Sequence, residues 1–176
     1  LARSRGLGDV YKRQVQYKLT ILRNKKTSNT VFRQTMNEIS YLIASDVLQY
    51  VPFKKQTIET PLKKMSGTAL GQPIILVPIL RAGLGLLEGF AKFLPEAEKG
   101  HIGLYRDEQT YEPVEYLFKL PRVKNKKVLI LDPMLATGNS SIAAINLIKN
   151  KGVNIKDIFL VSCLLYTSDA ADDCEG

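Results

Sequence analysis

The chain has 176 residues, of which 45% are hydrophobic and 24% are charged, and its formal net charge is +8 at pH 7. This length corresponds to one folded domain, and no internal repeat or low-complexity tract indicates a repeat architecture. The longest apolar run is interrupted by Pro73 and Pro78 and ended by Arg81, which excludes a membrane-spanning segment there.

The two ends of the chain carry an inverted DNA repeat. Residues 9–14 can be encoded by gat gtg tat aag aga cag, and residues 163–168 by its reverse complement in a shifted frame. A transposon end used as a sequencing adaptor gives this result. We therefore expect residues 1–14 and 163–176 to be adaptor read-through, flanking a truncated domain at 15–162. Without the flanks, which hold both cysteines, four basic residues and five acidic ones, the formal charge becomes +9.

Between these ends, hydrophobic patterns predict alternating strands and helices. An amphipathic helix is predicted at residues 30–49, and further helices at residues 84–94 and 142–150. Strands are predicted at residues 57–60, 74–80, 101–105, 114–120, 128–131 and 157–161, with 114–120 as an edge element between two prolines. This order predicts an α/β fold with a mostly parallel sheet flanked by helices.

The most informative segment follows the predicted strand at residues 128–131. Asp132 ends the apolar run, and the small polar residues at 137–141 precede a helix. Backbone N–H groups at a helix N-terminus, together with the helix dipole, favour a phosphate group. Ser140 or Ser141 is a candidate N-cap. The same pattern also suits an ordinary turn before a capped helix, so the loop alone favours phosphate binding only modestly.

Three segments in combination resemble the uracil phosphoribosyltransferase family. Residues 132–140 resemble its loop for 5-phosphoribosyl-1-diphosphate (PRPP), with Pro133 where most related enzymes have a second acid. Residues 77–85, which contain Arg81, resemble its diphosphate loop, and residues 103–116 resemble the segment with a second arginine, Arg106. Either arginine alone would more commonly be a solvated surface charge.

The resemblance implies a type I phosphoribosyltransferase fold, whose C-terminal part is missing, and transfer of phosphoribosyl from PRPP to uracil in pyrimidine salvage. The implied PRPP ligands are Arg81, Arg106, Asp132, Pro133, Met134, Leu135, Ala136, Thr137, Gly138, Asn139 and Ser140. It also implies Mg²⁺ carried mainly by PRPP, a cytoplasmic location, homo-oligomers and, in some members, a GTP effector. The family's glycine-rich uracil loop is not found in residues 1–176, so we expect this chain to bind PRPP weakly or not at all and to form no UMP.

Three alternatives stay open. The protein could be another phosphoribosyltransferase that uses a different base, because the residues present do not determine which base is bound. A regulatory RNA-binding protein on the same fold would suit the positive charge, but it should have a continuous basic face, and the lysines are scattered along the chain. A catalytically silent homologue could keep the PRPP site for sensing.

Overall fold

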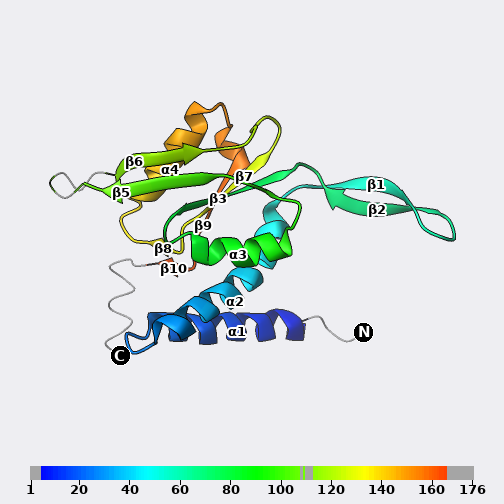
Figure 1. Cartoon of the computed structure of the whole chain (residues 1–176). Coiled ribbons are helices and arrows are strands. Elements are labelled where there is room, and N and C mark those ends of the chain that lie inside the picture. Colours follow the sequence, from blue (N-terminus) through cyan, green and yellow to red (C-terminus); the bar gives the residue numbers. More distant parts are fainter. Residues whose placement is uncertain (1–4, 108, 110–112, 166–176) are drawn as a thin grey trace.

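The structure is a computed structural model that describes residues 5–107, 109 and 113–165. It has an α/β architecture, as the sequence predicted (Figure 1). The helices are α1 (Arg5–Arg23), α2 (Asn29–Val47), α3 (Leu84–Phe93) and α4 (Asn139–Asn150), with short 3-10 helices at Leu48–Tyr50 and Ile155–Asp157. The strands are β1 (Phe53–Glu59), β2 (Lys64–Leu70), β3 (Ile74–Leu80), β4 (Glu98–Lys99), β5 (His101–Arg106), β6 (Pro113–Lys119), β7 (Lys127–Leu131), β8 (Met134–Leu135), β9 (Ile158–Val161) and β10 (Leu164–Leu165).

The main sheet has the strand order β6-β5-β3-β7-β9, and β4 pairs with β3. All neighbours are parallel except β6, which runs antiparallel to β5 at the edge. The predicted edge element is therefore confirmed. Residues of β7 are all buried, as are all but the last of β3, because helices cover both faces of these central strands.

Two apolar clusters lie on opposite faces of the sheet, since successive strand side chains point to opposite sides. On one face, Leu76 and Leu129 belong to a cluster that includes Ile39 of α2 and Phe90 of α3. On the other face, Val77 and Ile130 share a cluster with Ile148 of α4. The sheet is thus sandwiched between α2 and α3 on one side and α4 on the other.

One prominent element was predicted only in part. β1 and β2 form an antiparallel hairpin that projects from the body of the molecule (Figure 1), whereas the sequence predicted one short strand at 57–60. Every residue of β1 is exposed, so the hydrophobic alternation that marks a half-buried strand is weak there. At its tip, the Oγ1 hydroxyl of Thr60 donates a hydrogen bond to the carbonyl oxygen of Lys63.

The segments predicted as adaptor continue into described structure. Helix α1 runs from Arg5 to Arg23 and so crosses residue 14. Near the other end, Sγ of Cys163 lies 3.7 Å from Sδ of Met36 and 3.3 Å from the carbonyl oxygen of Pro133. Burial raises the pKa of the Cys163 thiol to about 11.

Candidate active site

Three parallel strands deliver the predicted site residues to one edge of the sheet. Arg81 follows β3, Arg106 is the last residue of β5, and Asp132 follows β7. Because these strands are parallel neighbours, their carboxyl ends lie at the same edge, which is where α/β proteins bind ligands. The expected convergence of the three loops is therefore confirmed.

Arg106 and the loop after β7 enclose a small common cavity of about 70 Å³. The lining residues are Arg106, Asp132, Met134, Leu135, Ala136, Thr137, Gly138, Asn139, Ser140 and Ser141. This cavity brings together nine of the eleven residues predicted to bind PRPP. It combines an exposed guanidinium, three hydroxyl-bearing side chains and the N-terminus of α4, which is suitable chemistry for a phosphate group.

The start of α4 differs from the prediction. The N-cap is Gly138 rather than Ser140 or Ser141, and its φ of 79° lies in the left-handed region that favours glycine. Gly138 has no side chain to bond the first N–H groups of the helix, although its carbonyl oxygen accepts a hydrogen bond from the Ile142 N–H. The uncapped amides of the first turn are therefore open to an anion.

Asp132 is a buried carboxylate at the floor of this cavity, with 9% of its surface exposed. The Oγ hydroxyl of Ser141 donates a hydrogen bond to its Oδ2 atom at 3.1 Å. Burial raises the pKa of Asp132, and the bonds from Ser141 and from the Met134 backbone offset part of that rise. Ser141 was predicted only as a loop hydroxyl or cap; its role in holding Asp132 depends on the helix starting at Asn139.

The loop is further anchored from the next strand. The N–H of Asp132 bonds to the carbonyl oxygen of Val161, and the Ser162 hydroxyl donates to the Asp132 carbonyl oxygen at 2.6 Å. Met134 and Leu135 form β8, which pairs in parallel with β10. These contacts fix both sides of Asp132, so the carboxylate is held in place before any ligand arrives.

Arg81 lies in a neighbouring recess rather than in the loop cavity. This recess has a volume of about 380 Å³ and is lined by Arg81, Ala82, Leu84, Gly85, Glu88, Pro133 and Met134, with Phe32, Arg33, Met36 and Asn37 of α2. Met134 borders both spaces, so the two adjoin. The contribution of α2, including Arg33, was not predicted, because nothing in its sequence distinguishes a site-facing arginine from a solvated one.

Steric contacts explain why position 83, after β3, is a glycine. A Cβ atom on Gly83 would lie 2.7 Å from the Ile79 nitrogen and would also collide with the carbonyl oxygen of Leu131. Gly83 therefore lets the turn after Arg81 pass against the end of β7. The peptide bond between Leu80 and Arg81 is cis.

The described residues contain no group of three or more His, Cys, Asp or Glu side chains that could hold a metal ion. Asp132 is the single carboxylate lining the loop cavity. His101, at the start of β5, is paired in register with Lys119 and lies away from the loop. Residues 108 and 110–112 of the segment after Arg106 lie outside the described residues.

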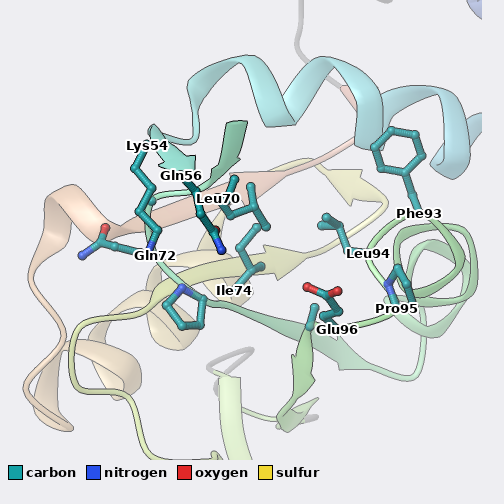
Figure 2. A pocket seen from close by; sticks show the side chains of 13 residues that line it. Lys54, Gln56, Leu70, Gln72, Ile74, Phe93, Leu94, Pro95 and Glu96 are labelled. Atoms are coloured by element: carbon teal, nitrogen blue, oxygen red, sulfur yellow. The ribbon is translucent and has the colours of Figure 1, made fainter. Parts of the chain in front are cut away.

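A larger cavity, of about 520 Å³, lies at the base of the hairpin (Figure 2). Its labelled side chains include Lys54 and Gln56 of the hairpin, Ile74 at the start of β3, and Leu94 and Glu96 after α3. Because Ile74 begins β3 while Arg81 follows it, this cavity lies at the opposite edge of the sheet from the predicted PRPP ligands. None of those ligands lines it.

Comparison with known proteins gives one family. The family profile described as uracil phosphoribosyltransferase matches residues 10–173. A uracil phosphoribosyltransferase of Levilactobacillus brevis is 48% identical over 151 residues, which cover 84% of this chain and 72% of that protein. One of Streptococcus mutans is 47% identical over the same shares.

Solved structures agree on the fold. A protein from Aquifex aeolicus matches with a TM-score of 0.74 and 28% identity, over 89% of this chain and 83% of that one. A purine phosphoribosyltransferase from Pyrococcus horikoshii matches with a TM-score of 0.56 and 17% identity, over 75% and 74% of the two chains. Within the part of the chain that the structure describes, no helix has the length and apolar character needed to cross a membrane.

Proposed function

The chain belongs to the uracil phosphoribosyltransferase family, and from this membership we infer that it serves the transfer of a phosphoribosyl group from PRPP to uracil, giving UMP and diphosphate in pyrimidine salvage. The observation that carries the proposal is the cavity shared by Arg106, Asp132 and residues 134–141 at the N-terminus of α4. It supplies a place for an anionic sugar phosphate at the edge where the sheet's parallel strands end.

We assign the 5-phosphate of PRPP to the loop. The backbone amides that follow Gly138, with the hydroxyls of Thr137 and Ser140, would donate hydrogen bonds to its oxygens. The left-handed Gly138 shapes this cradle, because a Cβ atom would be strained at its φ of 79°. The ribose would then lie over Asp132, with the carboxylate accepting hydrogen bonds from ribose hydroxyls.

Arg81 and Arg106 are assigned to the phosphate groups. A guanidinium presents a fork of donors that can hold phosphate oxygens in pairs, and both side chains are exposed at the strand ends. As the bond from C1 to the diphosphate breaks, negative charge grows on the leaving group and the ribose becomes oxocarbenium-like. The arginines stabilise the negative charge on the diphosphate, and the carboxylate of Asp132 stabilises the positive charge on the ribose.

Phosphoribosyltransferases generally use Mg²⁺ together with PRPP. One carboxylate in the cavity is too few for a cage built by the protein alone, but it suits an ion that keeps several waters and is held mainly by phosphates. We therefore propose that an Mg²⁺ ion would be held mainly by the diphosphate of PRPP, with Asp132 as the one carboxylate of the cavity available nearby. Such an ion neutralises part of the charge that develops on the leaving group.

Several finer parts of the proposal rest on the resemblance. They are the cytoplasmic location, assembly into a homo-oligomer and a GTP effector. The domain at 15–162 between adaptor-derived ends rests instead on the inverted DNA repeat. The resemblance likewise supports the expectation that residues 1–176 form no UMP, since the family's uracil loop is not found among them. Detectable UMP from PRPP and uracil would contradict that expectation.

The test of the site is PRPP binding measured by NMR titration, which also registers the weak binding expected of this chain. Arg106→Gln should weaken PRPP binding by about 10- to 150-fold, because charge-assisted hydrogen bonds contribute about 1.5–3 kcal/mol. Arg23→Gln, at the exposed end of α1, removes one arginine far from the loop in the sequence and should change the affinity less than twofold. Equal losses in the two variants would refute the assignment. Steeply salt-dependent binding of RNA would favour the regulatory alternative.

A further inference from the structure

A second cationic cavity lies at the far end of α4. It has a volume of about 450 Å³ and is lined by Phe118, Lys119, Leu120, Pro121, Arg122, Val123, Lys124 and Lys151. Four of these eight side chains are cationic and none is acidic. A volume of this size is within the range of small-ligand sites.

The four cations have no carboxylate partner among the described residues. The salt bridges of the described structure use other lysines: Lys18 with Glu38, Lys92 with Glu88, Lys126 with Glu98, and Lys127 with Asp157. Lys126 is the last residue of the connection that contains Arg122 and Lys124, and Lys127 begins β7. Acidic side chains therefore pair with the lysines at the end of this connection but not with Arg122 or Lys124. The positive charge around the cavity is therefore uncompensated.

The backbone of the connection holds this arrangement. Asn125 has a φ of 58°, and the N–H of Lys126 bonds to the carbonyl oxygen of Val123, which closes a turn. Beside it, Nζ of Lys151 lies 5.4 Å from the ring centroid of Phe118. Lys151 also follows the C-terminus of α4, where a cation is favourable to the helix dipole. That effect explains Lys151 but not the other three cations.

The cavity is separate from the PRPP loop. The loop lies at the N-terminus of α4 and Lys151 at its C-terminus, and a helix of 12 residues spans about 18 Å. Screening at physiological ionic strength acts over about 8 Å, so the two groups of charges are electrostatically independent.

We propose that this cavity is a second anion site, distinct from the PRPP loop, which binds a chain of two or more linked phosphates. Arg122 would hold two phosphate oxygens with its guanidinium, and Lys119, Lys124 and Lys151 would neutralise the remaining charge. A single phosphate would leave most of the four cations without a partner. Inorganic polyphosphates and nucleoside polyphosphates share this chemistry.

The experiment follows backbone amide signals of the protein by NMR during titration with inorganic triphosphate, and separately with ATP. We expect saturable shifts at residues 119, 120, 122–124 and 151–152, resolved from those of the loop at 137–142. Lys119→Gln/Arg122→Gln should weaken binding at this site by about tenfold or more. The matched control, Lys63→Gln/Lys64→Gln on the hairpin, removes the same charge and should change it less than twofold.

Tighter binding of ATP than of triphosphate, with a shift at Phe118, would identify a nucleotide as the source, and equal binding would identify the phosphate chain itself. Shifts confined to residues 137–142 would overturn the proposal. Equal weakening by the two double variants would overturn it in favour of a net-charge effect. Binding of a single-stranded oligonucleotide that tightens with its length beyond the affinity for triphosphate would overturn it in favour of a nucleic-acid surface.

Discussion

Replacing Ser141 by alanine tests whether the loop is held in place by a buried hydrogen bond. Ser141 is 3% exposed, and its hydroxyl donates to Oδ2 of Asp132 at 3.1 Å. A hydrogen bond to a charged group contributes about 1.5–3 kcal/mol, and removing this donor leaves a buried carboxylate with one partner fewer. We therefore expect Ser141→Ala to lower the free energy of unfolding by about 1.5–3 kcal/mol at neutral pH.

The loss should depend on pH. The bond from Ser141 lowers the pKa of Asp132, so without it that pKa rises further above its ordinary value. The destabilisation is then largest where Asp132 is ionised in both proteins. It shrinks as the pH falls through the pKa of Asp132 in the folded protein, because the protonated carboxyl needs the donor less.

The assay is urea unfolding of both proteins at several pH values. Ser140→Ala is the matched control, since Ser140 has the same side chain one residue earlier and is less buried. Among the residues that the structure describes, its side chain has no hydrogen-bond partner, so we expect a loss below about 0.5 kcal/mol. A double variant with Asp132→Asn measures the coupling between the two side chains. Equal losses in both serine variants, or a loss from Ser141→Ala that is independent of pH and of Asp132, would refute the reasoning.

Two further substitutions probe the same loop. Gly138→Ala should lower the free energy of unfolding by about 1–2 kcal/mol, because an alanine is strained at φ 79°, and it should weaken PRPP binding. The control is Gly67→Ala, which lies in the exposed hairpin and has no left-handed φ. An unchanged unfolding free energy for Gly138→Ala would contradict the assignment of strain. Asp132→Asn should raise stability at pH 7 while weakening PRPP binding. Burial raises the pKa of Asp132 above 3.8, so the folded state favours the protonated form, and stability falls as pH rises from the unfolded pKa to the folded one. Thermal unfolding at pH 4 and pH 7 measures this gain, which should be larger at pH 7; a loss of stability at pH 7 would contradict it.

Much of the fold could be predicted because its signals are local. Unbroken apolar runs mark β3 and β7 as strands buried on both faces, and the spacing of apolar residues marks α2 and α3. The hairpin was largely missed, because β1 buries none of its residues and so leaves no periodic pattern. The loop after β7 was found, but its cap was misplaced, since several small polar residues there suit a helix start equally well.

The sequence by itself predicted the residues that we propose to bind PRPP: an arginine after β3, an arginine at the end of β5, and an acid with a small-residue loop after β7. It did so because these residues lie in segments that resemble those of the family, and the chain order of strands and helices implies a parallel sheet. Only the tertiary structure decided the partners. It placed Arg106 in the loop cavity and Arg81 in the adjoining recess, joined Ser141 to Asp132, and gathered four cations at the far end of α4. The physical reason is that each of these arrangements depends on distances between segments far apart in the chain, or on the residue at which a helix begins.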